Sequence, residues 1–225
     1  HTKRPDLSVM TSIADYMRDK RMPYGVFDPM FPDDMAESTC SRVLRDRISL
    51  NLERNDFRVA HNYPYALPAG SMEVRAQVWF FFDYLRKAFI EKFPDTVEKP
   101  AYQRVWTMLL NTNLRLHEAE SLRGYLHRYR KAASAELKKF QKSQQAYAHV
   151  RSFLDNSTVE TDYRRSRDRP SSFAIEVRKD LVCDFDPVSG RPMATSKEID
   201  ERATLIGNVI AGAITTYFDT DRRYL

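Results

Sequence analysis

Apolar positions with helical spacing dominate the middle of the chain and predict three consecutive helices. The first follows Ser71, a residue suited to cap a helix N-terminus, and ends at Pro94. Pro100 is suited to the first turn of the second helix. The third pattern runs from Glu118 to Leu154, about 55 Å at 1.5 Å per residue if it is unbroken. Short connections favour antiparallel neighbours, so we expect a mainly α protein built on an antiparallel three-helix bundle.

The first seventy residues predict short helices interrupted by proline-rich turns. One helix is predicted by the helical spacing of four apolar side chains: Val9, Ile13, Tyr16 and Met17. Residues 22–32 hold three prolines and favour an extended strap packed over a neighbouring surface. A second helix would carry Leu44, Ile48 and Leu52 inward.

Beyond residue 155 the pattern changes. Residues 156–172 are polar and arginine-rich, and they predict an exposed arm. Alternating apolar residues then indicate a short extended segment: Phe173, Ile175 and Val177. Thr195 and Glu198 have the spacing of a capping box, which predicts the start of a last helix. The chain is thus divided into an N-terminal extension, a three-helix centre and a C-terminal extension: 1–70, 71–155 and 156–225.

Composition supports a folded, soluble chain. Hydrophobic residues make up 42% of the 225 positions, which excludes a disordered protein. Cys40 and Cys183 are the only cysteines, so a disulfide framework and a four-cysteine zinc site are excluded and a reducing compartment is indicated. The longest uncharged run, residues 203–218, is shorter than the roughly 18 to 20 residues that a membrane span needs. The chain begins at His1, an end that removal of an organellar presequence would leave, and both processing and simple truncation stay open.

The positive charge is local. The formal net charge is +5, and residues 118–151 carry all of it, with eight basic and three acidic side chains. A local excess on one predicted helix favours a docking face for an acidic partner over general attraction to polyanions. A solvated helix face is the alternative interpretation.

Few patterns in the sequence point to catalysis. Asp184 and Asp186 follow an apolar run and resemble the first motif of haloacid-dehalogenase phosphohydrolases, in which one carboxylate attacks phosphate. That chemistry needs a parallel sheet after the motif, and the remaining residues predict a turn and a helix. Glycine-rich phosphate loops and zinc or serine-hydrolase motifs are absent from the sequence, so we expect a protein that is not an enzyme. The alternative function is that of a mitochondrial RNA-binding or ribosome-associated helical protein, which would use the arginines at residues 164–169 and the basic third helix.

Short motifs along the centre of the chain resemble those of a known family. They appear in the order Tyr84-Leu85-Arg86-Lys87-Ala88-Phe89, Phe93-Pro94-Asp95-Thr96-Val97, Arg104-Val105, Met108, His149-Val150 and Phe153. This order resembles the LYR-motif family of small mitochondrial three-helix proteins, and most of all the LYR accessory subunit on the matrix arm of respiratory complex I. The resemblance covers about residues 73–177. It departs from the family in the signature itself, where Arg86 replaces the aromatic residue.

The resemblance implies a non-catalytic accessory subunit of a mitochondrial respiratory assembly, on the matrix side of the inner membrane. Proteins of this family dock a mitochondrial acyl carrier protein, whose acidic helices meet basic residues of the motif. The corresponding contacts here are Leu85, Arg86, Lys87, Arg104, Arg123, Arg130 and Lys131. The carrier's acyl-phosphopantetheine is the only cofactor implied, with none bound directly, and its fatty chain would be lined by Phe81, Phe82, Phe89, Trp106, Leu109 and Tyr129. The alternative for these aromatic side chains is that they simply fill the core.

Overall fold

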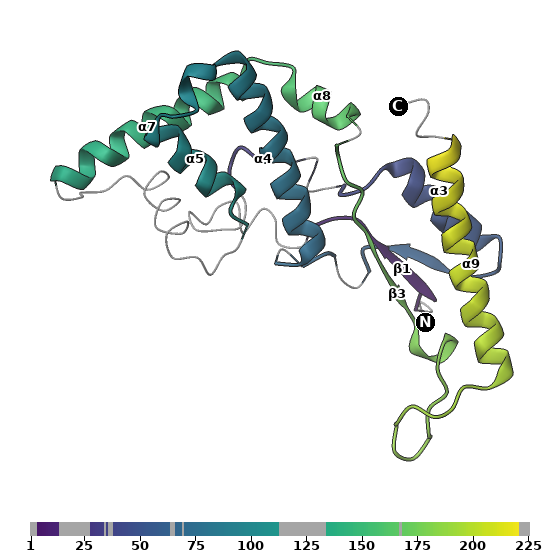
Figure 1. The fold of residues 1–225 in the computed structure, drawn as a ribbon. Coiled ribbons are helices and arrows are strands. Elements are labelled where there is room, and N and C mark those ends of the chain that lie inside the picture. Colours follow the sequence, from purple (N-terminus) through teal and green to yellow (C-terminus); the bar gives the residue numbers. More distant parts are fainter. Residues whose placement is uncertain are drawn as a thin grey trace. The chain divides into compact units, whose positions relative to one another are not determined.

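The computed structural model describes residues 4–13, 28–33, 35, 38–63, 66–68, 70–112, 134–166 and 168–220. Within these residues the chain is mainly helical and carries one three-stranded sheet, so the predicted mainly α class is confirmed at this level (Figure 1). The chain forms two compact units. The sheet unit comprises His1–Ser12, Ser38–Leu67 and Ser171–Leu225, and the helical unit comprises Ile13–Glu37 and Pro68–Pro170. The two predicted extensions therefore both contribute to the sheet unit.

The sheet is built from three short strands that lie far apart in the sequence. Strand β1 (Leu7–Met10) is central, with β2 (Val59–His61) parallel to it and β3 (Ala174–Val177) antiparallel. The helix predicted through Val9 is therefore wrong where the structure describes it. All four residues of β1 are buried, and a continuously buried run of this kind shows no clear alternation in the sequence. Residues 14–27, which include the rest of the predicted helix, lie outside the described residues.

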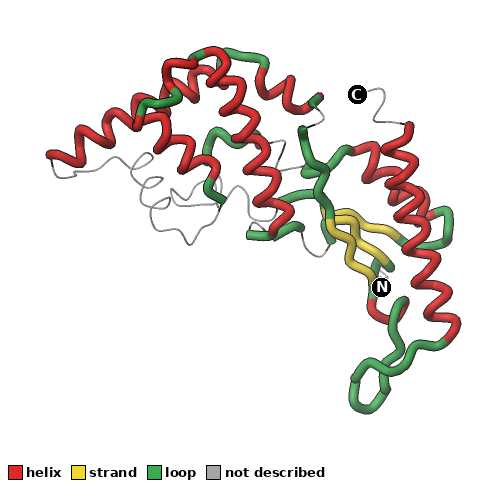
Figure 2. The backbone as a smooth tube through the Cα atoms, viewed as in Figure 1, coloured by secondary structure: helices red, strands yellow, loops and turns green. Residues whose placement is uncertain are grey.

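Two helices pack together on one face of this sheet, α3 (Arg42–Glu53) and α9 (Lys197–Thr220), and Figure 2 shows the resulting two layers. Their shared core contains strand and helix residues: Leu7, Val9, Leu44, Ile48, Leu52, Ile206, Ala213 and Tyr217. The inward face predicted for α3 is confirmed. Helix α9 begins one residue later than a capping box at Thr195 would place it, because Ser196 Oγ accepts the hydrogen bond from the backbone N–H of Ile199 at 3.3 Å.

The described part of the helical unit contains the α-helices α4 (Met72–Lys92), α5 (Pro100–Leu110), α7 (Ser134–Asp155) and α8 (Val159–Arg165), and the short 3-10 helix η1 (Pro94–Thr96) follows α4. Their predicted starts are confirmed for α4 and α5, since Ser71 Oγ accepts from the N–H of Val74 and Pro100 opens α5. Helices α4, α5 and α7 contact one another. The described part of the predicted third helix begins at Ser134, and residues 113–133 lie outside the described residues.

Helix α8 corrects the prediction of an exposed arm at residues 156–172. Val159 and Tyr163 lie one helical turn apart and are both buried, and α8 packs against α4. On the exposed face, Arg164 forms an ion pair with Glu160. The prediction followed the arginine-rich composition and overlooked the helical spacing of Val159 and Tyr163.

Candidate partner-docking groove

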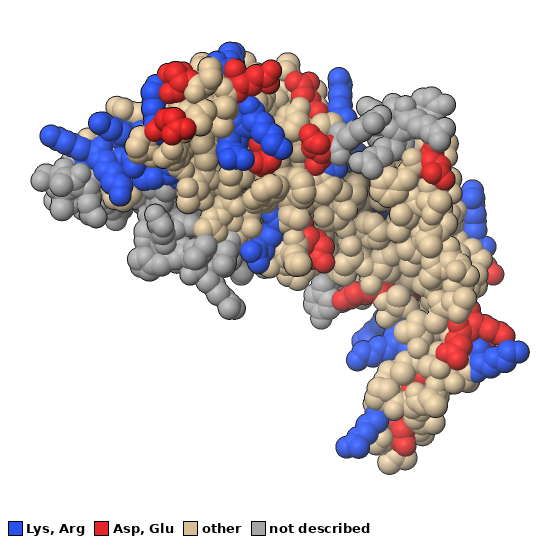
Figure 3. Space-filling model, viewed as in Figure 1, with Lys and Arg blue, Asp and Glu red and all other residues tan. Residues whose placement is uncertain are grey.

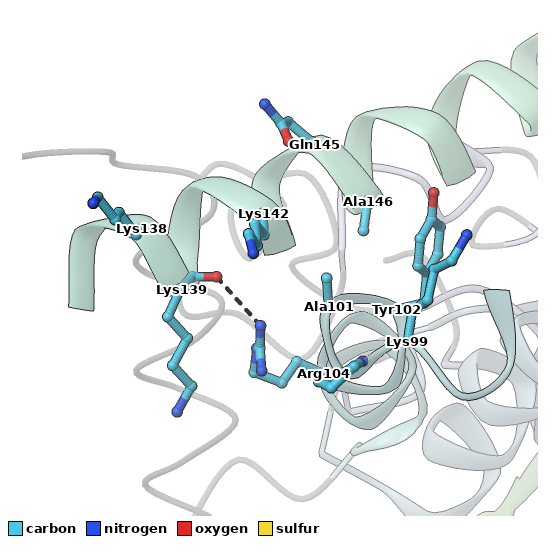
Figure 4. Close-up of a pocket in the computed structure, with 10 residues that line it drawn as sticks. Lys99, Ala101, Tyr102, Arg104, Lys138, Lys139, Lys142, Gln145 and Ala146 are labelled. Carbon is cyan, nitrogen blue, oxygen red and sulfur yellow. Dashed lines mark hydrogen bonds between the residues drawn. The ribbon is translucent and has the colours of Figure 1, made fainter. Parts of the chain in front are cut away.

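A groove of about 590 Å³ lies between α5 and α7 in the helical unit. Five basic side chains lie in its wall, and none of the lining residues that the structure describes is acidic. The lining residues are Lys99, Pro100, Ala101, Tyr102, Arg104, Lys138, Lys139, Lys142, Gln145 and Ala146 (Figure 4). Figure 3 shows Lys and Arg side chains gathered over this end of the helical unit.

Arg104 is held in place between the two helices. Its Nε donates a hydrogen bond to Ser143 Oγ at 2.8 Å, and its Nη2 donates to the backbone carbonyl of Lys139 at 3.3 Å, the contact drawn in Figure 4. Ser143 is completely buried and itself donates to the Lys139 carbonyl at 3.1 Å. The guanidinium is therefore anchored by neutral groups, and it forms no ion pair with a residue that the structure describes.

Three lysines on α7 supply further positive charge. Lys138, Lys139 and Lys142 are exposed, and none forms an ion pair with a residue that the structure describes. Lys99 differs, because its Nζ lies 2.6 Å from Asp95 and this hydrogen bond raises the pKa of Lys99. Both members of that pair are well exposed to water, so the pair is weak. The α7 lysines and Arg104 thus make the groove an anion-attracting surface.

The groove also has a small apolar floor. Ala101 and Ala146 line it from α5 and α7, and the Tyr102 ring forms one wall (Figure 4). The Tyr102 hydroxyl lies 2.8 Å from His149 Nδ1, which fixes the ring against α7. A floor of small apolar side chains inside a ring of cations suits an acidic partner that also presents apolar groups.

The predicted signature residues on α4 lie in a different environment. Leu85 is fully buried in the core. Arg86 Nη2 and Lys87 Nζ lie 2.7 Å and 2.9 Å from the carboxylate of Asp83, which is itself buried. Burial raises the pKa of Asp83, but hydrogen bonds from Lys87 and Arg86 outweigh this effect and leave the pKa below its ordinary value. Arg86 and Lys87 therefore share an anion within the chain.

The residues predicted to line a fatty chain separate into two aromatic clusters. Phe81 and Phe82 pack with Phe31, and Phe81 also packs on Tyr163. The ring of Phe89 contacts rings on both neighbouring helices: Tyr102, Trp106, His149 and Phe153. Leu109 of α5 is also buried. All five described candidates therefore lie in the core of the helical unit.

Four of the predicted site residues lie outside the described residues: Arg123, Tyr129, Arg130 and Lys131. Of the described predictions, only Arg104 lines the groove. The sequence prediction missed Lys99. It assigned the contact to the basic positions of the third helix as a group, without singling out Lys138, Lys139 and Lys142. Their spacing on one helix was the available signal, since residues four apart share a helix face.

The two carboxylates of the candidate phosphohydrolase motif accept hydrogen bonds from nearby backbone N–H groups. Asp184 Oδ2 accepts from the N–H of Ser196, and Asp186 Oδ1 accepts from the N–H groups of Val188 and Ser189. The Asp-x-Asp pattern thus forms turns around the start of α9. Among the described residues, no group of three or more His, Cys, Asp or Glu side chains is placed to hold a metal ion. In the same part of the chain, no helix has the length and apolar character required to span a bilayer.

Comparisons with known proteins give no relative. A scan against protein-family models, a search of curated proteins and a search of solved structures each find no match.

Proposed function

We propose that this chain is a non-catalytic helical subunit that docks an acidic protein through the groove between α5 and α7. The observation that carries the proposal is the charge of the groove, whose described lining residues include five cations and no acidic side chain. Opposite charges on two surfaces speed their encounter and favour the correct partner. The apolar floor at Ala101 and Ala146 supplies contact area that electrostatic attraction alone lacks.

The partner that this surface fits is a mitochondrial acyl carrier protein, and the host is a respiratory assembly such as complex I. The order of motifs from Tyr84 to Phe153 supports this assignment through its resemblance to the LYR-motif family. The contact of α4, α5 and α7 is compatible with the antiparallel three-helix arrangement of that family. In this proposal the carrier docks on Arg104 and the α7 lysines, and Arg86 and Lys87 add a weaker contribution because Asp83 neutralises part of their charge.

A charge-reversal experiment tests the proposal. The double variant Lys138→Glu/Lys142→Glu replaces two groove cations by anions, and titration calorimetry measures binding of acyl carrier protein to the full chain. We expect affinity to fall about tenfold or more at low salt, since each reversed charge turns an attraction into a repulsion. The affinity of the unchanged protein should also fall as salt is raised.

The matched control is Lys179→Glu/Lys197→Glu, which makes the same change of net charge on exposed lysines of the sheet unit. The affinity of this variant should stay within about twofold of that of the unchanged protein, because neither lysine lines the groove. Equal losses in both variants would show that only net charge matters, and the groove would then not be the docking site.

RNA binding is the second candidate, and the same groove could attract phosphate. It predicts an affinity for single-stranded RNA that exceeds the affinity for the carrier. Arg164 argues against the arginine cluster as its main site, because this side chain is paired with Glu160.

A further inference from the structure

A short strap enters the interior of the helical unit. The strap predicted at residues 22–32 is described from residue 28 on, and the name is used below for residues 28–33. The Phe31 side chain is 1% exposed. The Phe31 ring meets the ring of Phe81 edge-on, with centroids 5.7 Å apart, and it lies 6.3 Å from the ring of Phe82. Edge-on aromatic pairs of this kind add to the stabilisation that burial gives. Phe31 thus lies against two of the side chains that the sequence assigned to an acyl chain.

A buried polar contact holds the strap in this position. The Tyr147 hydroxyl of α7 donates a hydrogen bond to Asp28 Oδ1 at 2.6 Å, and both side chains are buried. The same carboxylate oxygen accepts from the N–H of Met30 at 2.9 Å, and the N–H of Phe31 donates to the Asp28 carbonyl at 2.9 Å. These bonds form a tight turn whose geometry directs Phe31 inward. A charged acceptor makes such bonds stronger than neutral ones.

We propose that Phe31 is the internal occupant of the apolar site beside Phe81 and Phe82, so that the chain docks its carrier without taking up the carrier's acyl chain. This inference rests on the proposed function and specifies which form of the partner is recognised. A well-packed interior has no room for a second apolar group unless the first one leaves. For an acyl chain to enter, the hydrogen bond between Asp28 and Tyr147 would have to break and the Phe31 ring would become exposed to water. The affinity of the groove for the carrier is therefore the same whether or not the carrier is acylated.

The test compares two forms of one partner. Unacylated acyl carrier protein and the same carrier loaded with a decanoyl chain are each titrated into the full chain by calorimetry. For the unchanged protein we expect affinities within about twofold of each other, because only the surface of the carrier makes contact. A preference of tenfold or more for the decanoyl form would overturn the inference, since burial of several methylene groups gives at least that factor.

The variant Phe31→Ala empties the site. It should create a preference for the decanoyl form of about tenfold or more, because a buried apolar cavity binds apolar ligands. The matched control is Phe80→Ala, which removes a ring that is 40% exposed on α4 and should leave both affinities equal. If Phe31→Ala folds and shows no preference, the inference is wrong.

The outcomes for the two proposals are distinct. If neither form of the carrier binds the unchanged protein, the docking proposal fails. If both bind but the decanoyl form binds far more tightly, docking stands and only the role of Phe31 is rejected. Should Phe31→Ala fail to fold, the comparison on the unchanged protein still decides the question.

Discussion

Two buried carboxylates each form ion pairs with two basic side chains. These pairs reduce the positive charge that the four basic side chains present to a partner. Asp83 binds Arg86 and Lys87 in the helical unit. In the sheet unit, Asp6 binds Arg58 and Arg178 at 2.8 Å and 2.7 Å. Cations that share a carboxylate attract an outside anion less strongly than isolated ones. The groove differs from both sites because its arginine is anchored by a hydroxyl and a carbonyl.

The Asp6 site predicts an acid-sensitive sheet unit. Hydrogen bonds from Arg58 lower the pKa of Asp6 below its ordinary value of 3.8, and burial opposes them only in part. A lowered pKa in the folded state means that the stabilisation is complete above about pH 4 and is lost as pH falls through the folded value. We expect Asp6→Asn to reduce the free energy of unfolding by about 2 kcal/mol at pH 7, and by progressively less below pH 4. Urea denaturation at a series of pH values measures both effects.

The control for this prediction is Asp95→Asn. Asp95 also pairs with a lysine and has a lowered pKa, but its side chain is 72% exposed. Exposed pairs contribute little, so this variant should change stability by less than about 0.5 kcal/mol at any pH. A loss for Asp6→Asn that stayed constant down to pH 2 would contradict the assigned role of the carboxylate.

At the scale of elements, a serine directly precedes the first residue of α3, α4 and α9, and two of these three serines act as caps. Ser71 Oγ and Ser196 Oγ each accept a backbone N–H at 3.3 Å, whereas Ser41 makes no side-chain cap at the start of α3. We expect Ser71→Ala and Ser196→Ala each to cost about 1 kcal/mol, because an N–H at the helix start loses its acceptor. Ser41→Ala is the internal control and should cost a few tenths of a kcal/mol at most. Equal losses in all three, measured by chemical denaturation, would rule out capping as the cause.

Helices could be predicted where local chemistry sets their ends. Ser71, Pro94 and Pro100 gave the bounds of α4 and the start of α5 correctly, because caps and prolines act within one turn. Strand β1 could not be predicted in this way. Its identity depends on β2 and β3, and β3 lies more than 160 residues further along the chain, so no local pattern records the pairing.

The candidate site shows the same division between local and long-range information. The sequence located the positive charge on the third helix but not the groove, which needs α5 to lie against α7. It also placed Leu85 at a docking surface, whereas the structure buries it, since the face of a helix that becomes core depends on its neighbours. The proline-rich segment around Phe31 predicted that the strap packs over a neighbouring surface, but not that Phe31 packs against Phe81 of α4.

At the scale of the whole molecule, the chain contains two separate hydrophobic cores. Ile48 of α3 is fully buried in the sheet unit, and Phe89 of α4 is fully buried in the helical unit. Ile48→Ala should cost about 2 to 4 kcal/mol and Phe89→Ala about 3 to 5 kcal/mol, because each leaves a cavity in its own core. Since substitutions without shared contacts act independently, each should speed amide hydrogen exchange chiefly within its own unit. Exchange measured by mass spectrometry should thus show faster exchange in α9 for Ile48→Ala and in α5 for Phe89→Ala. If Ile48→Ala accelerated exchange equally in α5 and α9, the two cores would unfold as one, and the carrier-docking groove would depend on the sheet unit for its stability.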